Sequence, residues 1–354
     1  MKREAGQSGL DRRSQEVLEA IVKAYVESGE PVGSRTVSRL SSEGVSAATI
    51  RNVMADLEER GLLSQPHTSA GRVPTDLGYR LYVDSLGAMP LERSEERLIE
   101  SSLHEEQAEF TELFTAVSRI LARFSKHLGV VVSPHMARVR LRDIEFVRLG
   151  PKRVLVIVVA GSGMLHNKVI QIEDDFDQEW LDKIGRYLTT TFKGLTLPEI
   201  RDRILELMGQ EKALYDQLLG DALRLGRAGL DPVPSEAGEV FLGGTTNLLD
   251  EPEFGRIERL RSLFRTFEEK HELLRVLNSC LEQQTSGVQV FIGSENSSPN
   301  MSDCSLVTSS YGLKGQSLGT LGIIGPTRME YARAIALVDS VARLFSQALS
   351  RYPG

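Results

Sequence analysis

Residues 31–84 decide the fold, and they read PVGSRTVSRLSSEGVSAATIRNVMADLEERGLLSQPHTSAGRVPTDLGYRLYVD. The pattern predicts a short helix over 34–40, which the polar, glycine-ended run 41–44 cannot continue. Ser46 stands in an N-cap position ahead of a second helix over 47–60, where its hydroxyl accepts from an unpaired backbone N–H. The stretch therefore predicts two helices joined by a short turn.

A small hairpin is predicted directly after the second helix. Gly61 is a helix stop, and two short extended runs, 62–66 and 72–74, flank the turn-rich tip 67–71. Helix, turn, helix and hairpin in this order predict a winged helix-turn-helix, a domain that places its second helix in the major groove of DNA.

The second helix has one apolar face and one face suited to DNA. Its apolar residues at helical spacing are Ile50, Val53, Met54 and Leu57. The outward residues of its first turns are Ser46, Ala47, Thr49, Arg51, Asn52 and Ala55, and no acid occurs between Glu43 and Asp56. An ordinary amphipathic helix is the alternative for these residues alone. The preceding helix and the hairpin favour the DNA-reading interpretation.

Base-edge contacts are predicted for Arg51 and Asn52, since arginine pairs with guanine and asparagine with adenine through two hydrogen bonds. Thr49 or Ala47 is predicted to touch a thymine methyl group. Ser46 has two interpretations, helix capping and phosphate contact, of which capping is favoured.

Phosphate contacts are predicted at the start of the first motif helix, where backbone N–H groups favour an anion. The residues concerned are Ser34, Arg35 and Thr36. Arg72 is predicted to enter the minor groove or hold a phosphate. His67 is predicted either to contact DNA or to bond local backbone as a turn residue, and the sequence does not choose between them.

Four strings carry a family resemblance: GEPVGSR at 29–35, ATIRNVMADLE at 48–58, QPHTSAGRVPT at 65–75 and GYRLYVD at 78–84. They resemble the HrcA family of heat-shock repressors, and weaker echoes continue through GGTTNLL at 243–249 and GIIGPTRM at 322–329. The resemblance covers essentially the whole chain. It implies a dimeric repressor of chaperone operons (groEL/dnaK class) that binds an inverted-repeat CIRCE operator and depends on the GroEL chaperonin.

Composition bounds the class of protein. A chain of 354 residues with 41% hydrophobic residues predicts two or three domains with ample cores. No apolar run approaches the ~20 residues that cross a bilayer, and the N-terminus lacks the apolar core of a signal peptide. Only Cys280 and Cys304 are present, without metal-ligand spacing. We expect a cytoplasmic protein without membrane partner, metal or cofactor.

The net charge by itself opposes DNA binding. The chain carries −7, and residues 1–90 hold 11 Lys or Arg against 12 Asp or Glu, which leaves −1. A protein that binds any duplex should be basic. A dimeric, sequence-reading protein need only sort its charges by face, so we expect modest non-specific affinity and a strong dependence on sequence.

The remainder predicts a sheet domain with an insertion. After Pro90 an acidic stretch predicts a long helix that continues into an apolar stripe over 110–128, and the stripe is favoured as a core-facing helix over a dimer seam. Strand-like runs over 130–172 and 288–324 enclose a mostly helical block. The residues predicted to bury its surface against a second subunit are Trp180, Tyr187, Leu188 and Phe192.

The predicted fold class is α+β multidomain. Residues 1–90 form the winged helix-turn-helix, and the family resemblance makes the rest a GAF-like α/β domain interrupted by an inserted, mostly helical dimerising domain. The limits expected are 91–173 for the first GAF-like part with its linker helix, 174–252 for the insertion and 253–354 for the second GAF-like part.

Two other classes of function stay open. A GAF-like domain suggests a winged-helix regulator gated by a small molecule, although fold analogy names no ligand. An enzyme is disfavoured, because six scattered histidines form no HExxH motif and only His166 near Asp174 is suggestive. Gly161-Ser162-Gly163 lacks the lysine of a phosphate loop and predicts a turn.

Overall fold

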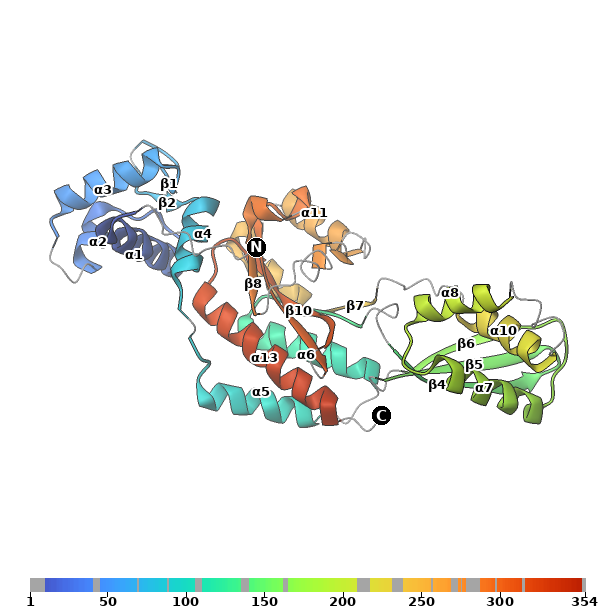
Figure 1. Cartoon of the computed structure of the whole chain (residues 1–354). Helices are drawn as coiled ribbons and strands as arrows, with labels where there is room; N and C mark the ends of the chain where they lie inside the picture. Colours follow the sequence, from blue (N-terminus) through green and yellow to red (C-terminus); the bar gives the residue numbers. More distant parts are fainter. Residues whose placement is uncertain are drawn as a thin grey trace.

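The computed structural model shows an α+β protein built from helices and several antiparallel sheets (Figure 1). The structure describes residues 10–40, 45–68, 70–87, 89–105, 110–134, 140–161, 165–208, 217–230, 238–255, 257–268, 273–274, 276–277, 287–296, 298–313 and 316–351. The turn predicted at Gly161-Ser162-Gly163 lies in part outside these residues, and Cys280 lies outside them altogether.

The N-terminal head has the two helices and the hairpin predicted for it, with one further helix before them and one after. In chain order its elements are α1 (Arg12–Ser28), α2 (Ser34–Leu40), α3 (Ala47–Glu59), β1 (Leu63–Ser64), β2 (Val73–Pro74) and α4 (Asp76–Ser85). The two strands pair antiparallel, Leu63 with Pro74 and Ser64 with Val73. The predicted apolar stripe of α3 is buried, with Ile50 and Leu57 fully shielded from solvent.

Local capping explains where α3 begins and ends. The hydroxyl of Ser46 accepts from the backbone N–H of Thr49 at 3.2 Å. Gly61 has a φ of 73°, a left-handed conformation that glycine adopts without penalty. The N–H groups of Gly61 and Leu62 then donate to the carbonyls of Glu58 and Leu57, which closes the helix end.

The long helix predicted after Pro90 is two helices, α5 (Arg93–Glu105) and α6 (Phe110–Ser125), which lie against each other (Figure 1). The acidic start of α5 is held by arginines of the last helix, α13 (Tyr331–Arg351): Arg333 pairs with Glu95 and Arg343 with Glu96. The apolar stripe of α6 faces the core, as favoured from the sequence, and Val117 and Leu121 are fully buried.

A five-stranded antiparallel sheet forms the centre of the body, in the order β7-β3-β10-β9-β8. Its strands are β3 (Leu128–Val132), β7 (Val240–Gly243), β8 (Gln289–Ile292), β9 (Cys304–Leu313) and β10 (Gln316–Pro326). Val131 packs with the layer of α6 and α13, whereas Val130 and Val132 pack with α11 (Ile257–Glu268) on the opposite face. The alternation of a strand thus builds two apolar layers.

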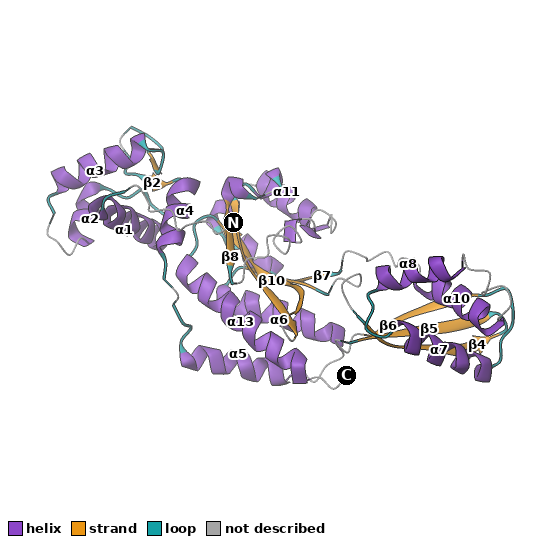
Figure 2. Cartoon of the chain, viewed as in Figure 1, coloured by secondary structure: helices purple, strands orange, loops and turns teal. Residues whose placement is uncertain are grey.

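A second sheet stands apart with its own helices (Figure 2). Strands β4 (Leu141–Gly150), β5 (Arg153–Ala160) and β6 (Leu165–Gln171) pair antiparallel with one another. Helices α7 (Gln178–Phe192), α8 (Leu197–Met208) and α10 (Gln217–Leu230) share one core with this sheet.

The three strands over 141–171 form a sheet of their own. The strands over 141–171 were expected in the first GAF-like part, yet they pair with one another and pack on α7, while the five-stranded sheet is made of other strands. The side chains expected to meet a second subunit also lie in this core: Leu188 and Phe192 are each 1% exposed, and Trp180 donates its ring N–H to Asp221. These side chains are buried within one chain because the apolar face of α7 packs on the three-stranded sheet.

Candidate nucleic-acid interface

Helix α3 presents the two side chains predicted to read bases. Arg51 and Asn52 are exposed, and they extend from a helix whose opposite side is anchored by Ile50, Val53 and Leu57. The first turn of α3 carries no acid. The exposed acids Asp56 and Glu59 lie in the C-terminal half of the helix. An arginine and an asparagine side by side on a firmly packed helix can hydrogen-bond to neighbouring base edges.

The N-terminus of α3 is occupied by its own cap. The Ser46 hydroxyl lies 3.0 Å from the Thr49 hydroxyl in addition to accepting from the Thr49 N–H. The capping interpretation of Ser46 is therefore confirmed, and Thr49 takes part in the same cap. Ala47, one residue into the helix, is half-buried.

The start of α2 carries the three residues predicted to meet phosphates. Arg35 is exposed, whereas Ser34 and Thr36 are half-buried. The carbonyl of Gly33 accepts from the N–H groups of Thr36 and Val37, so the helix is formed from its first turn.

The hairpin of β1 and β2, predicted to be the wing, is tied to the rest of the head at its second strand. A guanidinium nitrogen of Arg72 lies 2.8 Å from a carboxylate oxygen of Glu58 on α3, and the Arg72 side chain is only 21% exposed. The backbone of Arg72 also exchanges two hydrogen bonds of 2.9 Å with Val32. A side chain on Gly71 would come within 2.5 Å of the Val32 carbonyl, so only glycine fits there.

The tip of the wing is braced by a residue that the sequence did not single out. The Gln65 amide donates to the carbonyls of Thr68 and Ala70, each at 3.0 Å. His67 has an exposed side chain, and its carbonyl accepts from the N–H of Ala70. A glutamine before a turn is too common in sequences to have signalled this role.

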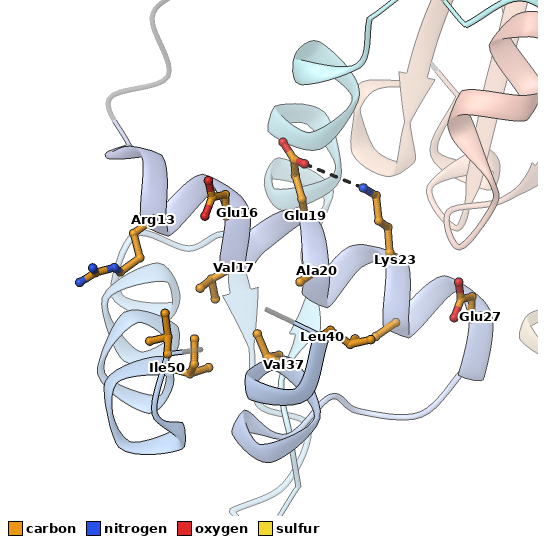
Figure 3. A pocket seen from close by; sticks show the side chains of 12 residues that line it. Arg13, Glu16, Val17, Glu19, Ala20, Lys23, Glu27, Val37, Leu40 and Ile50 are labelled. Atoms are coloured by element: carbon orange, nitrogen blue, oxygen red, sulfur yellow. Dashed lines mark ion pairs between the residues drawn. The ribbon is translucent and has the colours of Figure 1, made fainter. Parts of the chain in front are cut away.

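Helix α1 supports α2 and α3 from behind. Its residues Val17, Leu18, Ile21 and Val22 are buried. A cavity of about 330 Å³ opens between α1 and the other two helices, and Figure 3 shows Val17, Val37 and Ile50 among its lining. Its rim carries charges of both signs, among them the Glu19–Lys23 pair. The acids Glu16, Glu19 and Glu27 of α1 line this cavity.

The described residues contain no group of three or more His, Cys, Asp or Glu side chains placed to hold a metal ion. Nor is any helix in the described part of the chain long and apolar enough to span a membrane. The thiol of Cys304 is buried, and burial raises its pKa to about 12, which leaves it protonated and unreactive.

Fold and surface together define an α+β protein whose helical N-terminal head exposes the polar face of α3 and is joined to a larger, sheet-bearing body. The chain belongs to the HrcA family. The family model described as "HrcA protein C terminal domain" matches residues 111–335. The "Heat-inducible transcription repressor HrcA" of Geobacter sulfurreducens is 44% identical over 341 residues, covering 96% of this chain and 98% of the relative.

A second relative and one solved structure extend the comparison. The "Heat-inducible transcription repressor HrcA" of Syntrophobacter fumaroxidans is 42% identical over 351 residues, covering 98% and 99% of the two chains. A crystal structure of a hypothetical protein matches with a TM-score of 0.58 and 21% identity, and covers 96% of this chain and 99% of its own. At that identity the match supports the fold alone.

Proposed function

We propose that this protein is a sequence-specific DNA-binding repressor of heat-shock chaperone operons, that its head is a winged helix-turn-helix, and that it acts without being an enzyme. One observation carries the proposal: α3 is a capped, well-packed helix that exposes Arg51 and Asn52 and has no acid in its first turn. The names of its relatives, heat-inducible transcription repressors, support the same conclusion.

The proposed roles follow from the positions of the side chains. Arg51 and Asn52 read base edges in the major groove, and Thr49 or Ala47 meets a thymine methyl group. Arg35, with the backbone at the start of α2, holds a phosphate. Arg72 and His67 meet the duplex from the wing. Because Ser46 already caps α3, its hydroxyl contributes through the helix rather than through a phosphate.

The proposed operator is the inverted-repeat CIRCE element, bound by a dimer. Inverted half-sites match the two-fold symmetry of a dimer, with recognition helices one helical turn, ~34 Å, or a multiple apart. The body is proposed to be GAF-like. The unit over 141–230 is proposed to be the inserted dimerising domain, because one face of its sheet lies away from the core it shares with its helices.

That sheet face has an apolar row that runs across all three strands. Val147 pairs with Leu155 and Leu155 with Val169, so the three side chains point to the same face. Val147 and Val169 are 36% and 48% exposed, whereas the opposite face is covered by α7 and α10. An apolar sheet face left open in one chain is suited to pack on the same face of a second copy.

Regulation is proposed to run through the GroEL chaperonin. A repressor whose folded dimer is only marginally stable loses its DNA-binding population when warmed, and free chaperonin restores it. Occupancy of the operator would then report the folding load of the cell. Operator affinity that is unchanged by GroEL at every temperature, also after mild heat stress, removes this part of the proposal.

A binding titration at fixed salt tests the proposed function. The inverted-repeat operator is compared with a scrambled duplex, with and without GroEL, for wild type, Arg51→Ala and Arg13→Ala. We expect wild type to prefer the operator by a factor of about 10³ or more. Arg51→Ala should lose that preference. Arg13→Ala should keep it, because Arg13 lies on α1 at the rim of the cavity behind the reading helices.

Equal, weak binding of wild type to both duplexes in the presence of GroEL would refute the proposal. Equal binding that turns into operator preference only on addition of GroEL would instead show that the purified chain is inactive by itself. The two results separate a wrong function from a missing partner.

A further inference from the structure

The head is docked on the body through α4. A guanidinium nitrogen of Arg80 lies 2.8 Å from a carboxylate oxygen of Glu295, and a second one donates to the Val290 carbonyl at 2.6 Å. One carboxylate oxygen of Asp76 accepts from both the backbone N–H and the hydroxyl of Ser294, each at 2.9 Å. These partners belong to β8 and the turn after it, so two side chains of the head grip one edge of the body.

A separate contact holds the C-terminal end of α1. The Arg328 side chain donates to the carbonyl of Val26 at 2.8 Å and forms an ion pair with Glu253. The Val26 carbonyl belongs to the last turn of α1, where carbonyls have no partner within the helix and attract a cation. Arg328 is 17% exposed and Glu253 27%, so solvent screens the contact only in part.

The surroundings of Arg328 fix its position from both sides. Gly29 ends α1 with a φ of 73°, and a side chain placed there would meet the Arg328 guanidinium at 3.5 Å. On the body side, Glu253 follows Glu251, which lies 3.0 Å from His127. The His127 carbonyl in turn accepts from Asn247. Asn247 of the string GGTTNLL thus binds the backbone of the body, whereas Arg328 of the string GIIGPTRM reaches the head.

The docking leaves the reading surface free. Figure 1 shows α4 on the side of the head that faces the body, with α3 on the far side. The ring of Tyr79 on α4 packs on that of Tyr331 at the start of α13, with centroids 5.7 Å apart. Helix α3 contacts α1 and β1 of its own head. The direction in which Arg51 points is therefore set by how α1 and α4 sit on the body.

We propose that Arg328 is a positioning residue for operator recognition: it clamps the end of α1 to Glu253 and so holds the head in the orientation in which a dimer presents both recognition helices to the two half-sites. This inference rests on the proposed function. Its physical basis is the effective concentration of the second head at the second half-site. That concentration is high only when the orientation of the head on the body is fixed, because the second head then meets its half-site without a new search. A loosely held head also loses conformational freedom on binding.

The proposal separates two affinities that a merely structural role would lower together. Arg328→Gln removes the ion pair and the bond to Val26 but touches no residue of the reading face. We expect its affinity for the full inverted repeat to fall about tenfold or more, while its affinity for a single half-site changes less than about twofold. Arg328→Lys keeps one cation and should recover part of the loss, since an ammonium cannot match the planar fork of a guanidinium.

The experiment uses the full chain with GroEL present, and titrates the full repeat, a single half-site and a scrambled duplex. The matched control is Arg259→Gln, which removes an arginine pair with Asp303 inside the body and should change neither affinity. Thermal unfolding of each variant guards against misfolding. Glu253→Gln, which leaves the bond to Val26 possible, is the milder variant if Arg328→Gln does not fold, and its full-repeat affinity should fall less.

The outcomes distinguish the two proposals. Wild type that does not prefer the repeat over the scrambled duplex refutes the proposed function and the clamp with it. Wild type that prefers the repeat, with Arg328→Gln or Glu253→Gln binding it equally well, refutes the clamp alone. Tighter binding of the repeat by Arg328→Gln also overturns the clamp, because the docked orientation would then oppose recognition. Parallel loss on the repeat and on the half-site assigns Arg328 a structural role only.

Discussion

A guanidinium nitrogen of Arg72 and a carboxylate oxygen of Glu58 lie 2.8 Å apart, and this ion pair joins the wing to the C-terminal half of α3. The pair links the residue predicted to reach DNA from the wing with one of the acids at the end of α3. A duplex phosphate and the Glu58 carboxylate would therefore compete for the same guanidinium. In the unbound protein the Arg72 side chain is therefore bound to Glu58 and does not extend into solvent.

The competition predicts opposite effects for the two partners. Arg72→Ala should weaken binding to operator and scrambled duplex alike, and should lower the dependence of log affinity on log salt by about one phosphate contact. Glu58→Gln frees the guanidinium and should raise affinity for both duplexes a few-fold. Titrations at several salt concentrations measure both effects. An Arg72→Ala variant with the salt dependence of wild type would show that Arg72 serves α3 and not DNA.

The cap of α3 gives a second prediction, in which stability and affinity separate. Ser46→Ala removes the acceptor for the Thr49 N–H and should lower the free energy of unfolding by about 1 kcal/mol. Ser46→Asp keeps an acceptor and should retain the stability, but its charge at the DNA face should lower operator affinity. Chemical denaturation and titration are compared for both variants. Full affinity in Ser46→Asp would place this helix end away from phosphates.

Local signals explain which parts of the fold could be predicted. Ser46 and Gly61 delimit α3 because capping and left-handed backbone depend on neighbours within a few residues. The exposure of Arg51 and Asn52 follows from the same local periodicity. The strands over 141–171 were predicted as strands, but which sheet they join depends on pairing between distant segments. An alternating pattern does not contain that information.

Long-range contacts set the same limit on the candidate site. The Arg72–Glu58 pair joins the residue before β2 to α3, and the Arg328–Val26 contact joins residues separated by most of the chain. The sequence around an arginine does not indicate which distant residue its side chain will contact. The break between α5 and α6 escaped prediction for a similar reason, because apolar and acidic residues continue through it without a proline or a glycine.

Packing of α4 against the wing gives a third prediction. A side chain on Gly78 would approach the Leu62 carbonyl to 2.2 Å, which neither backbone can relieve without moving. Gly78→Ala should therefore lower the free energy of unfolding by about 1–3 kcal/mol, although alanine is the better helix former. Gly87→Ala, in the linker where nothing lies within 4 Å, is the control and should be neutral. Equal stability of the two variants would contradict the close approach.

The open sheet face predicts how a dimer would be lost. Val169→Glu places a charge in the apolar row with Val147 and Leu155 and should shift the chain from dimer to monomer in sedimentation velocity. Leu98→Glu changes an apolar residue on α5 that is 58% exposed, against 48% for Val169, and should leave the dimer intact. Dissociation by Leu98→Glu, with Val169→Glu still dimeric, would move the interface to the linker.

Two buried tyrosines at the junction of head and body are predicted to differ in what their hydroxyl groups contribute to stability. The Tyr79 hydroxyl is buried without a hydrogen-bond partner among the described residues, whereas the Tyr331 hydroxyl donates to the Thr327 carbonyl at 2.7 Å and lies 2.6 Å from the Ser305 hydroxyl. Tyr79→Phe should be neutral or stabilise by about 1 kcal/mol, and Tyr331→Phe should destabilise by about 1–2 kcal/mol. Chemical denaturation near neutral pH measures both.

The same pair predicts the behaviour at alkaline pH. Burial raises the pKa of Tyr79 and of Tyr331 above the ordinary value of 10.0, so the folded protein keeps both protons where the unfolded chain has lost them. Their contribution to stability is complete below pH 10 and is lost as the pH rises towards the folded values. Tyr79→Phe should reduce this alkaline loss, measured by denaturation at stepwise higher pH. A loss as steep as that of wild type would show that Tyr79 ionises freely and is not sealed between α4 and α13.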